Sequence, residues 1–133
     1  MELADLLAVP YNRHGSSPDT GFNCYTLAKY VRHRFFTLYS PPIDLHDFTE
    51  EEGSAVIVDW GPHWQETDTP EAGDWVFMRG AGKQTWHHCG VLLDNDQVIH
   101  AYEFGGLHGK VMIHSLPILR RRFEAITFAR WLA

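Results

Sequence analysis

Hydrophobic and polar positions recur with different periods in the two halves of the chain. Between residues 24 and 38, apolar side chains recur three or four positions apart, as they do along one face of a helix. Asn23, which precedes this stripe, belongs to the residue types preferred at a helix N-cap. The pattern predicts a helix from Cys24 to about Phe36, whose buried stripe is Cys24, Leu27, Ala28, Val31, Phe35 and Leu38.

The segments beside this helix carry weaker signals. Leu3, Leu6 and Leu7 predict a short amphipathic helical turn over residues 1–9, which Pro10 ends. Gly, Ser and Pro residues then predict a loop over 11–19. Residues 43–72 are acidic and irregular, with one short β-like run at 55–58.

From Gly73 onward, short apolar runs bounded by turn residues predict strands. They cover residues 74–78, 87–93, 97–102, 110–114 and 123–131, with a helical turn at 116–122. Helices followed by a meander of strands indicate an α+β fold with an antiparallel sheet. We expect a single domain over residues 1–133, since this length can bury one core.

Charge and hydropathy exclude two classes of partner. The formal net charge is −6, which argues against sequence-independent binding to nucleic acid. No apolar run approaches the roughly 20 residues of a membrane helix, so we expect no membrane insertion. The first ten residues lack a basic n-region and a long apolar segment, so we expect no signal peptide.

Cys24 is a candidate nucleophile because of its place in the predicted helix. The positive end of a helix dipole favours a thiolate, and the inward face lets other elements bring a base to it. The structural alternative is a small core cysteine, which is common because free cysteines are usually buried. A bond between Cys24 and Cys89 also stays open, although their local contexts indicate different roles.

Two of the nine histidines lie inside apolar strands, namely His88 and His100. A nucleophilic cysteine needs a base, and the base needs a partner on its other ring nitrogen. Cys24, His88 and His100 fit these three roles in order. The histidines in polar or loop contexts are expected to have no chemical role: His14, His33, His46, His63, His108 and His114.

The two strand histidines can meet only if they share one face of a hairpin. A two-residue turn would place them on opposite faces. A three-residue turn, Asp94-Asn95-Asp96, pairs Leu92 with Val98 and puts His100 opposite Gly90, one diagonal step from His88. The chemistry therefore predicts a type I turn that ends with Asp96 at positive φ.

Four blocks in order resemble the NlpC/P60 cysteine peptidases. Pro10 to Pro18 is similar to the tyrosine-containing loop of that family, and Phe22 to Tyr25 to its nucleophile block. Pro70 to Asp74 is similar to its strand opener. His88-Cys89-Gly90 and His100-Ala101 are similar to its two histidine blocks, at the family's interval of twelve residues.

The chain departs from the family pattern around the cysteine. Asn23 replaces an aspartate, which keeps an N-cap and removes a carboxylate beside the thiol. Tyr25 and Thr26 replace Ser-Gly, and the bulk of Tyr25 is expected to narrow one side of the cleft. The run from Pro70 to Arg79 is similar to short cell-wall peptidases of phage tails, which carry no wall-binding module.

The resemblance implies a papain-like core that cuts peptidoglycan stem peptides, typically after D-γ-glutamate. Cys24 would attack the carbonyl, His88 would act as the base, and His100 would orient it. The Cys24 N–H and the Tyr11 hydroxyl would stabilise the oxyanion, with Asn23 and Tyr25 beside the substrate. No metal or cofactor is implied, and phage tail-tip proteins would be the partners. The protein would reside in a virion tail, or in the cytoplasm before assembly, and act in the cell envelope.

Three other classes stay open. A zinc site could use His87, His88 and Cys89 with Cys24 or His100, although adjacent strand residues point to opposite faces. A structural tail or adaptor protein could keep the fold without the activity. An amidase or acyltransferase could use the same core.

Overall fold

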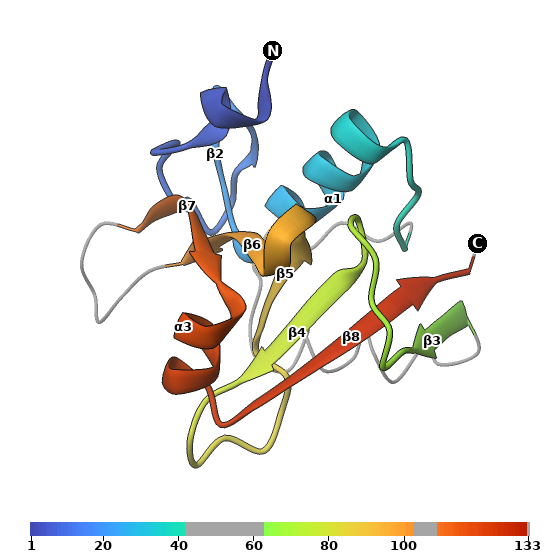
Figure 1. Cartoon of the computed structure of the whole chain (residues 1–133). Helices are drawn as coiled ribbons and strands as arrows, with labels where there is room; N and C mark the ends of the chain where they lie inside the picture. The colour runs from blue at the N-terminus through green and yellow to red at the C-terminus, as the bar shows by residue number, and fades with distance from the viewer. Residues whose placement is uncertain (42–62, 103–108, 133) are drawn as a thin grey trace.

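The computed structural model describes residues 1–41, 63–102 and 109–132 (Figure 1). The β-like run predicted at 55–58, and the histidines at positions 46 and 108, lie outside these ranges. In the described ranges, no helix is both long and apolar enough to cross a membrane.

The first 41 residues hold the predicted helices. A 3-10 turn, η1, covers Leu3–Leu6. Two short strands pair with each other: β1 (Ser16–Ser17) lies in the predicted loop, and β2 (Gly21–Phe22) follows that loop. Helix α1 covers Cys24–Phe36, as the apolar period predicts. It ends at Thr37, whose left-handed backbone (φ 54°) makes it the C-cap, so Leu38 lies beyond the helix.

In the part of the chain that the structure describes, six strands form one antiparallel sheet in the order β3-β8-β4-β5-β6-β7. The four strands predicted between residues 74 and 114 are β4 (Trp75–Arg79), β5 (His88–Leu92), β6 (Gln97–Tyr102) and β7 (Lys110–Ser115). The helical turn is α3 (Leu116–Arg122), and the last strand is β8 (Ala125–Trp131). The α+β prediction is confirmed, whereas edge strand β3 (Trp64–Glu66) was not predicted because its three residues lie in a polar segment.

The sheet has an apolar cluster on each face, and alternate residues of one strand enter different clusters. Trp75 and Phe77 of β4 belong to the cluster under α1, together with Leu27, Ala28 and Val31 of that helix. Val76 and Met78 belong to the second cluster, with Leu116 and Leu119 of α3 and with Phe123. Helices α1 and α3 therefore cover opposite faces of the sheet (Figure 1).

The hairpin between β5 and β6 has the predicted register. Val91 pairs with Ile99 and Leu92 with Val98, around the three residues Asp94–Asp96. Asp96 has the predicted positive φ (57°), but Asn95 also has one (60°). The type I assignment is therefore wrong, because that turn keeps its central residues at negative φ. Asparagine tolerates the left-handed region, so the sequence permits both backbones.

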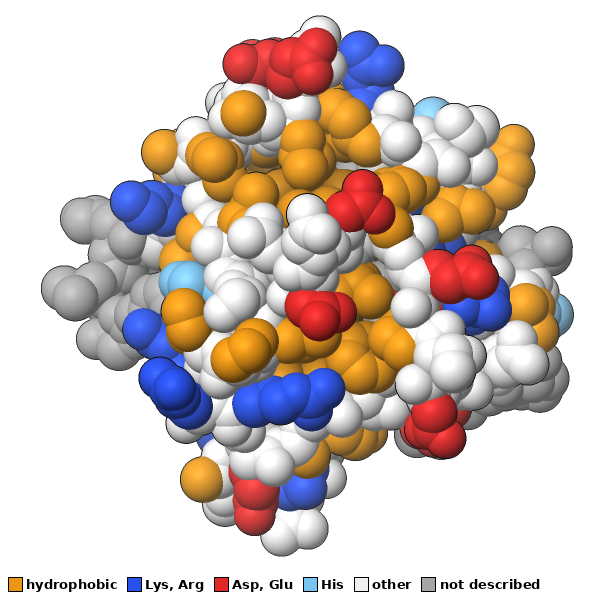
Figure 2. Space-filling model, in the orientation of Figure 1, with side chains coloured by type: hydrophobic (Ala, Val, Ile, Leu, Met, Phe, Trp, Pro, Cys, Tyr) orange, Lys and Arg blue, Asp and Glu red, His pale blue; other side chains and the backbone are white. Residues whose placement is uncertain are grey.

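The outer surface mixes charges of both signs. Figure 2 shows acidic and basic side chains interspersed with apolar ones over the face in view. Among the residues that the structure describes, the exposed large apolar side chains are scattered along the chain: Met1, Leu7, Leu38, Tyr39, Ile118 and Leu132.

Candidate active site

Helix α1 places Cys24 at its first position. The Asn23 side chain accepts a hydrogen bond from Thr26 N (2.8 Å), and its amide donates to the Arg13 carbonyl (2.9 Å). These bonds confirm the predicted N-cap and hold the helix start against the preceding loop. Cys24 is 3% exposed and lies in the cluster between α1 and the sheet.

Cys89 of β5 belongs to the same cluster as Cys24, and both thiols are free. Burial, and then a hydrogen bond with the Cys24 thiol, raise the pKa of Cys89 well above its ordinary value. The thiol of Cys89 is therefore protonated at neutral pH, as expected for a core cysteine.

His88 and His100 meet on one face of the β5–β6 hairpin, as predicted. His88 Nε2 and His100 Nδ1 are 2.8 Å apart, and both residues are buried. Gly90 lies between them: a Cβ built there would lie 3.1 Å from the His100 Cβ and 2.7 Å from the Ile99 carbonyl oxygen. The glycine therefore leaves the space in which the diagonal pair of rings can approach.

A third histidine, His114 of β7, extends this pair, although the sequence analysis assigned it no role. His100 Nε2 and His114 Nδ1 are 2.9 Å apart. His100 pairs with Met112, and Val98 with His114, so His114 is again one diagonal step away. The diagonal relation that joins His88 to His100 would also have identified His114 if the β6–β7 register had been known.

The three imidazoles are held in their neutral forms. Burial, with a smaller contribution from His100 and then His87, lowers the pKa of His88 well below its ordinary value. Burial, then His114 and Arg122, lower the pKa of His100 to about 3. Burial and then Arg122 also lower the pKa of the partly exposed His114. At neutral pH, each ring therefore carries one proton and can both donate and accept one hydrogen bond.

The structure does not bring Cys24 onto the face of the sheet that His88 occupies. The His88 ring stacks on Phe123 (5.6 Å between centroids, 13° between planes) and contacts Tyr102 (4.5 Å), on the α3 side. Cys24 packs with Cys89 on the α1 side. Cys89 and His88 are adjacent in β5, so their side chains point in opposite directions. The assignment of Cys24 as nucleophile and His88 as its base stays a prediction.

The residues predicted to lie beside the substrate have other contacts in this structure. Tyr25 is 1% exposed: its ring stacks on Trp75 (5.6 Å), and its hydroxyl donates to the Pro41 carbonyl (3.1 Å). Asn23 is fully buried and caps the helix. Tyr11 is partly buried and packs against the cluster under α1. Here, Tyr25 is a core residue and contributes no exposed surface to a cleft.

The histidine cluster has the geometry of hydrogen bonds. Two nitrogen ligands about 2.0–2.1 Å from one tetrahedral zinc ion lie farther apart than the 2.8 and 2.9 Å measured here. His87 is separate from the chain of rings, since its Nε2 accepts a hydrogen bond from Gly80 N (2.8 Å). Among the described residues, no group of three or more His, Cys, Asp or Glu side chains could hold a metal ion.

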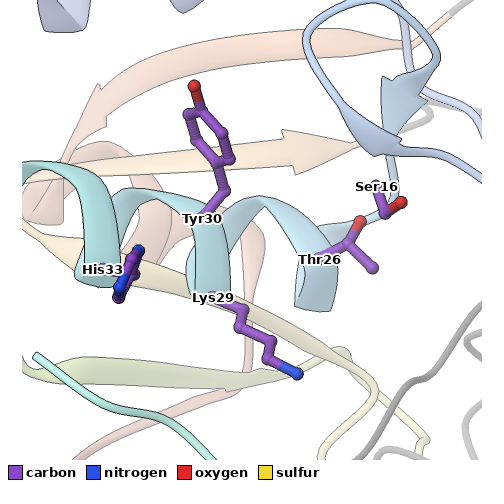
Figure 3. Close-up of a pocket in the computed structure, with 5 residues that line it drawn as sticks. All are labelled: Ser16, Thr26, Lys29, Tyr30 and His33. Carbon is purple, nitrogen blue, oxygen red and sulfur yellow. The ribbon is translucent and has the colours of Figure 1, made fainter.

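A pocket of about 260 Å³ lies on the outer side of α1. It is lined by Ser16, Thr26, Lys29, Tyr30 and His33, and Figure 3 shows these side chains along β1 and the helix. The pocket residues from α1 occupy helix positions between those of the buried stripe that contains Cys24. The pocket is therefore separate from both Cys24 and the histidine chain.

The architecture is that of papain-like α+β proteins: an antiparallel sheet carries on one face a helix that begins at a cysteine. A family model described as "NlpC/P60 family" matches residues 8–118, and the chain belongs to this family. No curated protein matches the chain significantly.

Solved structures of the same family share the fold. The P60 domain of an antigen from M. avium subspecies paratuberculosis is 20% identical, with a TM-score of 0.59, over 98% of this chain and 89% of that one. The NlpC/P60 domain of the peptidoglycan hydrolase SagA is 22% identical, with a TM-score of 0.55, over 95% and 89%. An NlpC/P60 protein from Bacillus cereus is 19% identical, with a TM-score of 0.58; this chain covers 37% of its length.

Proposed function

We propose that this protein is a cell-wall hydrolase, a cysteine peptidase that cuts peptidoglycan stem peptides. The observation that carries the proposal is the buried hydrogen bond between His88 and His100, at the two positions where the chain resembles the histidine blocks of its family. Membership of the NlpC/P60 family supports the same class of reaction, and the similar SagA domain belongs to a peptidoglycan hydrolase.

In the proposed reaction, Cys24 Sγ attacks the peptide carbonyl carbon while His88 takes the thiol proton. The Cys24 N–H and the Tyr11 hydroxyl stabilise the oxyanion that forms. The C–N bond then breaks, and His88 gives its proton to the leaving amine. Water attacks the thioester, and the acid leaves as the thiol is restored. His100 holds the ring of His88 in place throughout.

The bond cut is proposed to be the one after D-γ-glutamate, which the family resemblance implies. The same resemblance, through the run from Pro70 to Arg79, supports the location of this protein in a phage tail, from which it acts on the cell envelope. In that location, its proposed partners are tail-tip proteins.

One observation favours a second candidate function. Cys24 is buried beside Cys89, on the opposite side of β5 from His88, so the thiol and its proposed base are not in contact. A structural or adaptor protein that kept the fold but lost the activity needs no such contact. An amidase or acyltransferase on the same core would need it as much as a peptidase does.

Incubation with purified peptidoglycan, followed by mass spectrometry of the released material, separates these functions. The peptidase proposal predicts free peptides from the wild type and from Cys89→Ala, and none from a folded Cys24→Ala variant. Release by Cys24→Ala would remove this residue as the nucleophile. Sugar chains freed of whole stem peptides would indicate an amidase. Peptides joined to amines that were added to the reaction would indicate an acyltransferase.

Labelling with iodoacetamide near neutral pH tests the thiol independently of the substrate. A reactive Cys24 is labelled in the wild type and in Cys89→Ala, because an ionised thiol is the nucleophile. A folded protein that neither labels nor releases peptides supports the adaptor function.

A further inference from the structure

The hydrogen bonds between the three histidines restrict where their protons lie. Each neutral ring carries one N–H, and His100 must donate through one nitrogen and accept through the other. If His100 donates from Nδ1, then His88 carries its proton on Nδ1 and His114 donates from Nδ1. If His100 donates from Nε2, then His88 donates from Nε2 and His114 carries its proton on Nε2. The three rings therefore share one tautomer at a time.

Only one of these two states suits a base at position 88. In the state with all protons on Nε2, His88 Nδ1 is bare and can accept a proton. In the other state, His88 Nδ1 is already protonated and its Nε2 accepts from His100. The state with all protons on Nε2 requires His114 Nδ1, which lies 2.9 Å from His100 Nε2, to act as the acceptor.

We propose that His114 is a positioning residue of the site: it accepts a hydrogen bond from His100 Nε2 and thereby sets the tautomers of His100 and His88. That the three rings share one tautomer follows from the hydrogen bonds, whereas the choice of the Nε2–H state and its effect on activity rest on the proposed peptidase function. His114 touches no reacting atom; it acts through the two inner rings.

The surroundings favour a connected chain over three separate rings. His88 and His100 are 2% and 0% exposed, so no bulk water competes for their nitrogens. His88 contacts Phe123 and Tyr102, which offer its ring apolar surfaces. Arg122 of α3 is a charged group that acts on His100 and His114, and His87, the residue before β5, acts on His88. His114, at the end of the chain of rings, is partly exposed.

Asparagine is the matched substitution, because its Oδ1 occupies nearly the place of histidine Nδ1 and can accept the same bond. Leucine fills similar space but accepts nothing. His114→Leu is therefore expected to let His88 and His100 leave the Nε2–H tautomer. His114→Asn is expected to keep both rings in it. His33→Leu, at an exposed position of α1, controls for the loss of an imidazole elsewhere.

The first readout is the ¹⁵N NMR spectrum of the imidazoles at neutral pH, which separates protonated from bare ring nitrogens without any substrate. We expect Nε2–H for His88 and His100 in the wild type, in His114→Asn and in His33→Leu. In His114→Leu, we expect a shift toward Nδ1–H in both. Wild-type rings protonated on Nδ1, or tautomers unchanged in a folded His114→Leu, would overturn the proposal.

The second readout is peptide release from peptidoglycan. We expect His114→Leu to lower kcat on the order of tenfold, the lower end of the effect of removing a histidine's orienting partner at metal sites. His114→Asn is expected to recover most of that loss, with KM unchanged in both. Equal activity of the Leu variant and the wild type would overturn the catalytic part. If the wild type releases nothing while the NMR result holds, the peptidase function fails and the tautomer assignment stands.

Discussion

At the scale of single residues, the closest packing that the site requires is at Gly90. A Cβ there would lie 2.7 Å from the Ile99 carbonyl oxygen, 2.8 Å from Val98 Cγ1 and 3.1 Å from the His100 Cβ. The first of these neighbours is backbone and cannot move away without disturbing the β5–β6 pairing. A single methyl group at this position therefore affects both the stability of the sheet and the contact between the rings.

Gly90→Ala is expected to lower the free energy of unfolding by about 1–3 kcal/mol, the usual cost of overpacking. Urea denaturation measures this loss. The double variant with Val98→Ala removes one of the crowded atoms, so its total loss should be smaller than the sum of the two single losses. Additive losses would show that the crowding at Val98 costs nothing.

The buried histidines make the stability of the fold depend on pH. The pKa of His100 is about 3 in the folded protein, and an unfolded histidine titrates near 6.5. Between these values the unfolded chain binds a proton that the folded chain does not, so stability falls as the pH falls. The pKa of His88 is lowered as well, so the two sites act in the same direction.

We expect His100 to cost on the order of 1 kcal/mol of stability per pH unit below about pH 6, and His88 to make the slope steeper in the same direction. Urea denaturation at about pH 7 and pH 5 measures the slope. His100→Asn should show a shallower slope than the wild type, and the exposed His33→Leu an unchanged one. Equal slopes in all three proteins would contradict the lowered pKa.

At the scale of elements, the start of α1 depends on the two bonds of the Asn23 side chain. Its oxygen accepts from Thr26 N, and its amide donates to the Arg13 carbonyl. An aspartate, which the family pattern has at this position, could make the first bond but not the second. The neutral amide of Asn23 therefore suits this fully buried position, because it can donate to the Arg13 carbonyl.

Asn23→Ala removes both bonds and is expected to cost about 1–2 kcal/mol of stability, as the loss of a good N-cap does. Asn23→Asp keeps the cap and adds a charge that the helix dipole favours, but it leaves the Arg13 carbonyl without its donor. Its stability in thermal or urea denaturation should therefore lie between those of Ala and wild type. An Asp variant as stable as the wild type would show that the Arg13 bond contributes nothing.

At the scale of the whole molecule, Asp74 joins the start of β4 to β8, near the end of the chain. Its carboxylate accepts from Arg130 Nε (3.0 Å) and Nη2 (2.8 Å) and from Glu71 N (2.7 Å). The side chain of Asp74 is 5% exposed, whereas that of Arg130 is 34% exposed. Asp74 also opposes the effect of burial on the Arg32 guanidinium of α1, whose pKa burial lowers to about 10.

Asp74→Asn is expected to lower the free energy of unfolding by about 1.5–3 kcal/mol, because it weakens hydrogen bonds to a charged group in a buried place. Glu71→Gln is the matched control. Its side chain is 78% exposed and lies 3.8 Å from Arg130, so its loss should stay within about 0.5 kcal/mol. Equal losses of the two variants in urea denaturation would show that the exposed Glu71 carboxylate contributes as much as Asp74 and would contradict the prediction.

The sequence alone determined the parts that depend on local periods. The apolar stripe and Asn23 predicted the bounds of α1, and short-range pairing across Asp94–Asp96 predicted that His88 and His100 share a face. Strand alternation is a local property, so a turn length was enough to decide it. The same rule missed His114 only because the length of the preceding loop left the β6–β7 register open.

The tertiary structure alone decided which face of the sheet each helix covers. The stripe of α1 packs on the face with Trp75, Phe77, Val91 and Ile99, and α3 covers the face with the histidines. This choice depends on the total apolar area that each face offers, which residues from distant strands build together. Local spacing could therefore bring His88 to His100, but the side of the sheet on which Cys24 lies follows from the packing of the whole molecule.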